Sequence, residues 1–369
     1  MASGIRPNVA VHRVATTGPD DVAGLERLVR AGDLDPAGIV AILGKTEGNG
    51  CVNDFSRGFA TQSLKLFLHR HIGHDAAGSV CLVMSGGTEG ALSPHWIVFE
   101  RRESDEPAHG PALAMGSAIT PDLPPEHLGR RAQVEMVARG VADAMERAGI
   151  ADPAEVHFVQ IKCPLLTAAR VAEAEARGSA TATRDTLKSM GLSRGASALG
   201  VAVALGELAI GEIPDDAIGT DMGLWSGRAS TSAGIELMGH EILVLGMSPD
   251  WTGPLAIDHG VMRDAADIGP VRAALARLGL GASGQLDAPA RARVRAVLAK
   301  AEASRTGNVR GLRHTMLDDS DISATRHARA FVAGVLAGTV GMTDLFVSGG
   351  AEHQGPDGGG PVAIIAERG

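Results

Sequence analysis

Short runs of apolar residues alternate with polar, glycine-rich stretches along the chain, and three of these runs end in the same way. Two lead into Ser-Gly-Gly-x-Glu at 85–89 and 348–352, and a third leads into the looser Ser-Ala-Gly-x-Glu at 232–236. Another apolar run follows each motif, at 92–102, 240–248 and 360–368. Runs of this length and composition are typical of buried strands. We therefore expect each serine to lie at the end of one strand and to be followed by another strand.

A second feature recurs upstream of each serine, where a short apolar run ends in one lysine. The runs are IVAILGK, VHFVQIK and VRAVLAK, which end in Lys45, Lys162 and Lys300. The first two predict buried strands. The third also fits the end of a helix, because RARVRAVLAKAEAS at 291–304 has helical spacing.

A third feature lies between each lysine and its serine. The segments 54–68, 191–205 and 324–338 each place an arginine near the start of an apolar, helix-like stretch. The arginines are Arg57, Arg194 and either Arg326 or Arg329. Helices commonly begin at a serine or threonine N-cap, so we expect Ser56, Ser193 and Thr325 to cap these helices. A further helical pattern is predicted to begin after the two prolines at 124–125.

Each third of the chain thus reads lysine, then arginine, then serine. A purely structural repeat would explain recurring glycines and strands, but not the recurrence of these three polar residue types together. Polar, proline-rich or glycine-rich stretches at 100–116 and 247–260 divide the chain into units of 1–104, 112–249 and 254–369. We expect an α/β fold in which three similar units pack around a pseudo-threefold axis and share one central site.

Composition excludes several classes of function. The net charge is −9, whereas a nucleic-acid groove or a polybasic membrane surface needs surplus Lys and Arg. Aromatic residues make up 3% and Tyr is absent, which disfavours base-stacking platforms. The 3 cysteines lack metal-site or disulfide spacing, and no apolar stretch is long enough to span a membrane. We expect a cytoplasmic protein with no nucleic-acid or membrane partner.

The recurring residues suit nucleophilic attack on a carbonyl. Serine needs a base, and no histidine recurs with the serines, so a lysine whose pKa is lowered by burial is the candidate base. Glycines after the serine let backbone N–H groups approach a carbonyl oxygen, and arginines supply fixed donors. Three such sets would surround a small, flat ligand with several carbonyls, such as a cyclic imide, and one Ser/Lys pair would be enough for hydrolysis.

The chain resembles the cyanuric acid hydrolase and barbiturase family of cyclic-amide hydrolases over essentially its whole length. The matching segments are GKTEGNGCVND, VMSGGTEG, HFVQIKCPLLT, SRGASALG, SAGIELM, AKAEAS, RHTMLDDSDI and VSGGAEHQGPDGGGP. The resemblance implies three repeated units around a central site (the Toblerone fold), a homotetramer and no organic cofactor. It also implies ring opening, either of cyanuric acid to carboxybiuret, which loses CO₂ to give biuret, or of barbituric acid to ureidomalonate. The segments lean toward cyanuric acid.

The resemblance assigns roles that composition and spacing leave open. It makes Ser232 the nucleophile and Lys162 its activating partner. It assigns substrate binding to Arg57, Ser85, Gly86, Arg194, Ala233, Ser348, Gly349, Lys45, Lys300 and a third arginine. The family pattern favours Arg329 as this arginine, whereas the Ser-Arg or Thr-Arg dipeptide of the three segments favours Arg326. It implies a structural Mg²⁺ or Ca²⁺ bound by Glu302, Ala351, Gln354, Gly355, Pro356 and Gly359, and a turn-rich segment with exposed carbonyls suits such a cation.

Two other classes of function remain open at this point. A non-catalytic protein that binds a small cyclic imide would use the same pocket without consuming its ligand. A purely structural repeat scaffold would leave the three serines and three lysines scattered over separate faces.

Overall fold

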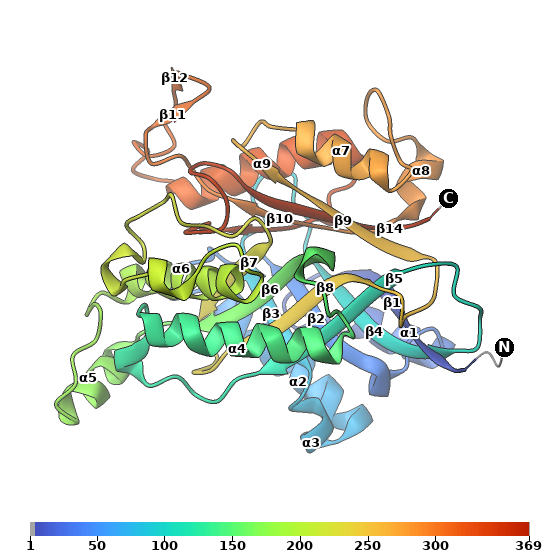
Figure 1. Ribbon diagram of the computed structural model, residues 1–369, viewed down its shortest axis with the longest axis horizontal. Coiled ribbons are helices and arrows are strands. Elements are labelled where there is room, and N and C mark those ends of the chain that lie inside the picture. The colour runs from blue at the N-terminus through green and yellow to red at the C-terminus, as the bar shows by residue number, and fades with distance from the viewer. Residues whose placement is uncertain (1–3, 369) are drawn as a thin grey trace.

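Three four-stranded sheets form the centre of the molecule, and the helices lie outside them (Figure 1). The computed structural model describes residues 4–368, so the outer limits expected for the first and third units, at residues 1–3 and 369, lie outside the described part. Each sheet draws its strands from one of the three ranges expected from the sequence. The fold is α/β, as the apolar pattern predicts.

The sheets share one topology. In each, the first strand pairs antiparallel with the last, the last pairs antiparallel with the second, and the second pairs parallel with the third. In sheet order, the strands are β1 (Arg6–Ala15), β4 (His95–Ser104), β2 (Ile39–Thr46) and β3 (Cys81–Gly86); β5 (Ala112–Ile119), β8 (Glu241–Ser248), β6 (Val156–Pro164) and β7 (Ala229–Gly234); and β9 (Leu255–Met262), β14 (Gly360–Glu367), β10 (Val294–Ala301) and β13 (Phe346–Gly349). A small ribbon pairs β11 (Asn308–Val309) with β12 (Leu312–Arg313).

A long helix connects the two parallel strands of each sheet, because parallel neighbours need a crossover connection. These helices are α2 (Phe55–Ile72), α6 (Thr186–Ala204) and α9 (Ala324–Val340). The others are α1 (Ala23–Ala31), α3 (His74–Ala77), α4 (Arg131–Arg147), α5 (Ala168–Ala176), α7 (Gly269–Arg277) and α8 (Ala288–Arg293), with 3₁₀ turns at Pro36–Gly38, Pro125–His127, Pro153–Glu155, Ile210–Glu212 and Asp215–Ala217.

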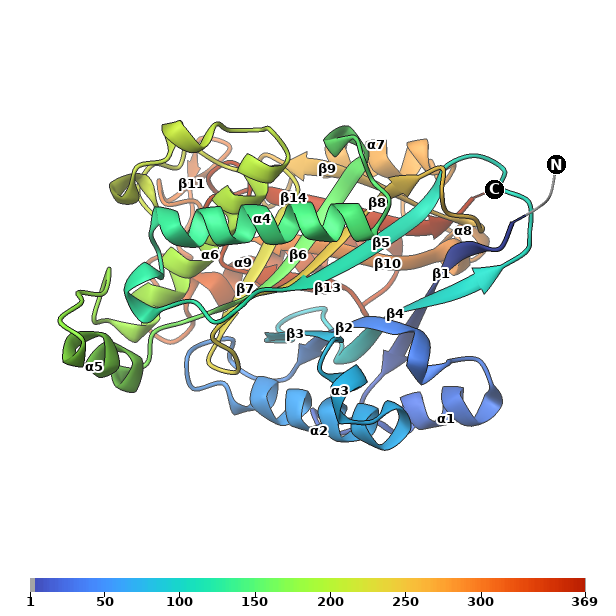
Figure 2. The ribbon, with the colours of Figure 1, turned by 60° about the horizontal axis from the view of Figure 1, so that its bottom comes forward.

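The sheets bury apolar side chains on both faces. The inner faces of all three meet in one core, to which Leu43, Ile161, Leu298 and Phe346 contribute. The outer faces pack against the helices, α1 and α2 on the first sheet, α4 and α6 on the second, and α7 and α9 on the third (Figure 2). This arrangement explains why these strands read as near-continuous apolar runs rather than alternating ones.

The helical interpretation of the third lysine segment is wrong, because Lys300 lies near the end of strand β10. The helix α8 ends at Arg293, and the chain becomes extended at Val294. Strand β10 then lies between β14 and β13, and its apolar residues are fully buried. Burial between two strands therefore outweighs the local helical spacing.

The expected N-caps are also wrong. The caps are Asp54 for α2 and Asp185 for α6, whose carboxylates accept backbone N–H groups of the first turn, and α9 begins after Ser323. Because α6 begins at Thr186, Arg194 lies in mid-helix and not at a helix start. The helix predicted after the prolines likewise begins later, at Arg131, since Pro125–His127 forms a 3₁₀ turn.

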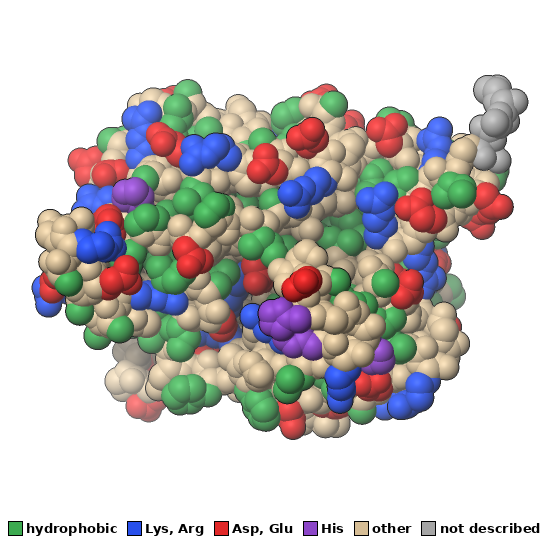
Figure 3. Space-filling model, turned by 90° about the horizontal axis from the view of Figure 1, so that it is seen from below, with side chains coloured by type: hydrophobic (Ala, Val, Ile, Leu, Met, Phe, Trp, Pro, Cys, Tyr) green, Lys and Arg blue, Asp and Glu red, His purple; other side chains and the backbone are tan. Residues whose placement is uncertain are grey.

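The face seen from below carries interspersed acidic and basic side chains with no continuous basic patch (Figure 3). Within residues 4–368, no helix combines the length and the apolar character that a membrane crossing requires.

Candidate functional site

One small cavity, of about 20 Å³, lies where the three units meet. Its lining contains the three serines, three arginines and neighbouring backbone that the sequence singled out: Arg57, Ser85, Gly86, Arg194, Ser232, Ala233, Arg329, Ser348 and Gly349. Two more lining residues, Gly50 and Met190, are not among the site residues predicted from the sequence. Since every unit contributes a serine and an arginine, the scaffold hypothesis, in which these groups scatter, is wrong.

The third arginine of the cavity is Arg329. It lies on the first turns of α9, is 3% exposed and faces the cavity. Arg326 is absent from the lining, and its Nε donates to the Glu89 carboxylate at 3.1 Å. The geometry therefore favours Arg329, the residue assigned from the family pattern. It disfavours Arg326, which follows Thr325 as Arg57 follows Ser56 and Arg194 follows Ser193.

Each serine lies beside the lysine of its own unit, because the second and third strands pair in parallel. The register partners are Lys45 with Ser85, Lys162 with Ser232, and Lys300 with Ser348. All three lysines are at most 1% exposed and lie behind the serines, outside the cavity lining. The Oγ atoms of Ser232 and Ser348 are 2.9 Å apart.

The lysines also connect neighbouring units in a closed ring. Each Nζ donates to the backbone carbonyl of the residue just before the next unit's serine. The three bonds are Lys45 to Val347, Lys162 to Met84 and Lys300 to Thr231, each 2.8 Å long. Every lysine therefore fixes the strand that carries a neighbour's serine, and this repetition is direct structural support for pseudo-threefold symmetry.

Burial lowers the pKa of every one of these lysines, because the ammonium ion loses its hydration. The pKa of Lys45 falls well below its ordinary value, with Arg329 adding to the effect. The pKa of Lys300 falls to about 7, with Arg194 adding to the effect. The pKa of Lys162 is also lowered by burial, but Glu236 opposes the change.

The motif glutamates pair with arginines of neighbouring units in a second ring. Arg329 donates to Glu89 through Nε and Nη2 at 2.9 and 2.7 Å, and Arg194 donates to Glu352 at 2.8 and 2.6 Å. These two-point contacts hold each guanidinium in a fixed orientation. They keep the pKa of Glu352 at about 2 even though burial acts to raise it.

The middle unit departs from this symmetry. Glu236 lies 3.1 Å from Lys162 Nζ but 3.9 Å from Arg57 Nε. Arg57 instead donates to the backbone carbonyls of Ala233 and Cys51, and its buried Nε has no hydrogen-bond partner. The other two lysines reach the hydroxyls of their own serines, at 3.3 Å in the first unit and 3.2 Å in the third. Lys162 pairs with a carboxylate where its counterparts contact a serine.

A second departure lies one layer below the same lysine. Gln160 and Ser230 are register partners two residues before Lys162 and Ser232, hence on the same face of the sheet. Both are fully buried, and Gln160 Oε1 and Ser230 Oγ lack hydrogen-bond partners. The corresponding pairs are apolar in the other sheets: Leu43 with Val83, and Leu298 with Phe346. The middle sheet alone thus places polar groups beneath its Ser/Lys pair.

A wider cavity adjoins the central one and shares Gly50, Met190, Arg194, Arg329 and Gly349 with it. It is lined further by loop and helix residues, including Asn49 and Leu187, which is 60% exposed. This outer cavity gives a small molecule a route from solvent to the serines.

The loop implicated in cation binding lies beside the third serine. Glu302 Oε2 accepts the backbone N–H of Ala351 at 2.7 Å, and shielding from solvent together with nearby Glu352 raises the pKa of Glu302 to about 7. Gly355 has φ of 106° and Gly359 lies against the carbonyl of Met262, so the loop folds tightly. The carboxylate of Glu302 and the backbone oxygens of this turn are the type of ligand that a hard cation prefers.

The sequence identified the recurring glutamates but assigned them no role. Each glutamate lies four residues after its serine, and this constant spacing is the pattern that indicates a shared role for them. Cys163, beside Lys162, is fully buried, and burial raises the pKa of its thiol. It lines neither cavity, and a buried thiol of this kind is inert.

Comparisons with known proteins agree over nearly the whole chain. Residues 10–367 match the family described as "Amidohydrolase ring-opening protein". A cyanuric acid amidohydrolase of Bradyrhizobium sp. is 68% identical over 97% of both chains, and one of Azorhizobium caulinodans is 66% identical over 98% of this chain and 99% of that one. A crystal structure of the A. caulinodans hydrolase superposes with a TM-score of 0.91 at 65% identity, covering 98% of this chain and 99% of that one. A second cyanuric acid hydrolase structure gives a TM-score of 0.93 at 49% identity, covering 98% and 100%.

Proposed function

The chain belongs to the ring-opening amidohydrolase family, and from this premise we propose that it hydrolyses one C–N bond of the cyanuric acid ring. The observation that carries the proposal is the convergence of three serines and three arginines, one of each per unit, on a single small cavity. A planar ring with three carbonyl groups offers each unit one carbonyl to bind.

We propose that Ser232 is the nucleophile and Lys162 its base. Lys162 in its neutral form takes the proton of Ser232 Oγ as the oxygen attacks a ring carbonyl carbon. The C–N bond then breaks, and the lysine returns the proton to the leaving nitrogen. Water hydrolyses the resulting ester on Ser232, which releases carboxybiuret, and loss of CO₂ leaves biuret.

The other two units hold the remaining carbonyls. Ser85 and Ser348 donate their hydroxyls, while Lys45 and Lys300 orient those hydroxyls from behind at 3.3 and 3.2 Å. In this proposal the backbone N–H groups of Gly86, Ala233 and Gly349, which follow the serines and line the cavity, donate hydrogen bonds that stabilise negative charge on a carbonyl oxygen. The arginines fix the ring in its plane through rigid donors.

The asymmetry described above supports the choice of the middle pair. Ser85 and Ser348 each contact their lysine, but Ser232 has its oxygen 2.9 Å from Ser348 Oγ and its lysine engaged by Glu236. With a ligand of approximate threefold symmetry, attack comes from one defined corner only if that corner differs chemically from the other two. The middle corner is the one that differs.

A structural cation fits beside this site. We propose that Glu302 and backbone carbonyls of Ala351, Gln354, Pro356 and Gly359, with Gly355 permitting the turn, hold Mg²⁺ or Ca²⁺. When bound, the cation supplies positive charge that compensates Glu302 and orders the loop next to Ser348. No organic cofactor enters the proposed reaction. A homotetramer and a cytoplasmic location remain predictions from the family resemblance.

Replacement of the nucleophile tests the proposal. Ser232→Ala removes the attacking oxygen, so turnover of cyanuric acid, followed by loss of ring ultraviolet absorbance, should fall by at least roughly 10³-fold. The matched control is Ser248→Ala, which removes a buried serine whose hydroxyl bonds Gly149 O, away from the cavity, and should leave turnover per folded enzyme unchanged.

Three results would contradict the proposal. Wild-type turnover by Ser232→Ala would exclude this serine as the nucleophile. Binding of cyanuric acid by wild-type protein with no loss of absorbance over hours would identify a non-catalytic binding protein. A higher kcat/KM for barbituric acid than for cyanuric acid would make the protein a barbiturase.

A further inference from the structure

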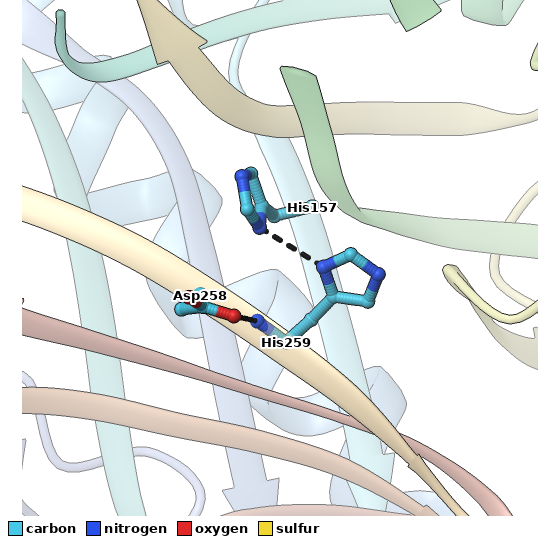
Figure 4. A group of neighbouring side chains, drawn as sticks. All are labelled: His157, Asp258 and His259. Atoms are coloured by element: carbon cyan, nitrogen blue, oxygen red, sulfur yellow. Dashed lines mark hydrogen bonds between the residues drawn. The ribbon is translucent and has the colours of Figure 1, made fainter. Parts of the chain in front are cut away.

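Three side chains able to bind a transition metal meet outside the central cavity, at the junction of the second and third units. His157 is the second residue of β6, and Asp258 and His259 lie in the middle of β9. Within residues 4–368 this group brings its nitrogen and oxygen ligand atoms within 4.8 Å of one another. The two Nδ1 atoms face each other at 2.9 Å, and the rings are nearly perpendicular, at 81° (Figure 4).

The fold itself does not require histidine here. The position five residues before the lysine of the second strand is His157 in the middle unit but Val40 in the first and Arg295 in the third. The histidine pair is therefore a property of this one junction and not of the repeated architecture.

The state of the two rings suits metal binding. The two Nδ1 atoms are 2.9 Å apart, which is close enough for both to bind one ion. A neutral imidazole carries its hydrogen on one nitrogen and a lone pair on the other. The present hydrogen bond requires one Nδ1 to carry its ring's hydrogen. When that hydrogen moves to Nε2 of the same ring, both Nδ1 lone pairs point toward the ion, which then replaces the hydrogen bond with no net loss of a proton.

Asp258 already has hydrogen-bond partners that an ion would have to replace in part. Its Oδ1 accepts the backbone N–H of His259 at 2.6 Å, and Arg277 donates to both carboxylate oxygens at 2.7 Å. Arg277 is 54% exposed, so the guanidinium can move into solvent while the carboxylate turns toward an ion. Arg228, the other nearby cation, is paired with Glu207 at 3.0 Å. Both arginines weaken the attraction for a cation, so we expect moderate affinity and not the tight binding of a closed structural site.

Ligand chemistry selects the class of ion. Two imidazoles and one carboxylate suit zinc and its neighbours in the first transition series, whereas Mg²⁺ and Ca²⁺ prefer oxygen ligands alone. We propose that His157, His259 and Asp258 bind a divalent transition-metal ion such as Zn²⁺, which cross-links β6 of the second unit to β9 of the third. The site is separate from the oxygen-lined loop around Glu302.

Metal titration of the chelator-treated full-length protein tests this proposal. We expect wild-type protein to retain one more Zn²⁺ per chain in equilibrium dialysis than the His157→Ala/His259→Ala double variant, and excess Mg²⁺ should not displace it. Co²⁺ should produce a visible d–d absorption band in the wild type that the double variant lacks. The matched control replaces two exposed histidines that are not part of this group, His109→Ala/His127→Ala, and should bind Zn²⁺ as the wild type does.

Equal Zn²⁺ uptake by wild-type protein and the double variant would overturn the proposal, as would a Co²⁺ spectrum that does not depend on His157 and His259. If the alanine variant does not fold, His157→Gln keeps a hydrogen-bonding side chain at the junction and removes the imidazole ligand. Loss of Zn²⁺ binding in that folded variant supports the site, and retained binding excludes it. Zn²⁺ should also raise the thermal unfolding midpoint of the wild type and of the control variant, but not that of the His157→Ala/His259→Ala variant.

Discussion

At the scale of single residues, Glu236 is the group that makes the three Ser/Lys pairs unequal. Its carboxylate lies 3.1 Å from Lys162, whereas the corresponding glutamates bind arginines. A carboxylate next to an ammonium ion favours the charged form and so raises the pKa of the lysine. The pH at which Lys162 becomes a competent base is thus set by burial and Glu236 together.

We therefore expect Glu236→Gln to shift the pH profile of kcat/KM. Without the carboxylate the pKa of Lys162 falls further, so the neutral base persists to lower pH and the acid limb of the profile moves to lower pH. The measurement is kcat/KM for cyanuric acid across the acid limb. The control, Glu89→Gln, loosens Arg329 and should raise KM without moving the limb. An unmoved limb in Glu236→Gln would show that this carboxylate does not tune the base.

The convergence of the reactive residues could be predicted from the sequence, because lysine, arginine and serine recur in order in each third. The pairing of Glu236 with Lys162 could not, since the three glutamates occupy equivalent motif positions. Their different partners depend on packing of whole units against one another, and no local pattern encodes that.

At the scale of elements, β6 and β7 contain a polar layer that the other sheets lack. Gln160 and Ser230 are buried with unpartnered oxygens, and an unsatisfied buried polar group costs about 1–3 kcal/mol. Such a cost beneath the proposed catalytic pair suggests a functional use, for instance as a place for an ordered water next to Lys162.

Replacing this layer by its counterparts in the first unit, Gln160→Leu with Ser230→Val, should raise the free energy of unfolding by about 1–3 kcal/mol and lower kcat. Chemical denaturation and steady-state kinetics measure the two effects. The sister change Leu43→Met, a substitution of similar volume in the first sheet, should leave both nearly unchanged. A double variant that gains stability at full activity would indicate that the polar layer has no catalytic role.

The start of α2 also connects an element to the site. Asp54 caps the helix by accepting from Ser56 N, and its other oxygen accepts the N–H of Gly50, which lines the cavity. Asp54→Ala should therefore cost about 0.5–2 kcal/mol of stability and also raise KM. Asp287→Ala removes the cap of α8, away from the cavity, and should lower the thermal midpoint without affecting KM. A KM unchanged in Asp54→Ala would separate the cap from the site.

Strand positions could be predicted from the sequence more securely than helix starts. The apolar runs ending in serine are strands as expected, because burial on both faces leaves a continuous hydrophobic signature. The N-caps are harder to predict because serine and aspartate are both good N-cap residues. The two caps are Asp54 and Asp185, which lie two residues before Ser56 and eight residues before Ser193. Only the path of the chain decides which of them begins the helix.

At the scale of the whole molecule, buried neutral histidines make stability depend on pH. Burial lowers the pKa of His240 to about 3, and its ring contacts Gln133 and Thr120 in the interior of the second unit. Below pH 6.5 the unfolded chain protonates this histidine while the folded chain does not. Between pH 6.5 and about pH 3 the free energy of unfolding therefore falls as the pH falls, because the unfolded chain binds a proton that the folded chain does not. Above pH 6.5 His240 is neutral in both chains and no longer lowers the stability.

His240→Gln should flatten this dependence by at most about 1.4 kcal/mol per pH unit. Urea unfolding at a series of pH values between about 5 and 7, above the range in which most carboxylates titrate, measures the slope. His109→Gln, at an exposed position, should keep the wild-type slope. A slope that is the same in all three proteins would mean that His240 is protonated equally in the folded and unfolded chains.

The closed ring of lysine-to-carbonyl bonds has a consequence for how such a catalyst can specialise. Three separate copies of one short chain could build the same ring, but every mutation would then appear at all three corners at once. Joining the copies end to end lifts this restriction, because each corner acquires its own codon. The pairing of Glu236 with Lys162 and the polar pair Gln160 and Ser230 are features that a trimer of identical chains could not confine to one corner. Covalent fusion thus allows a symmetric binding site to evolve one corner that differs from the other two.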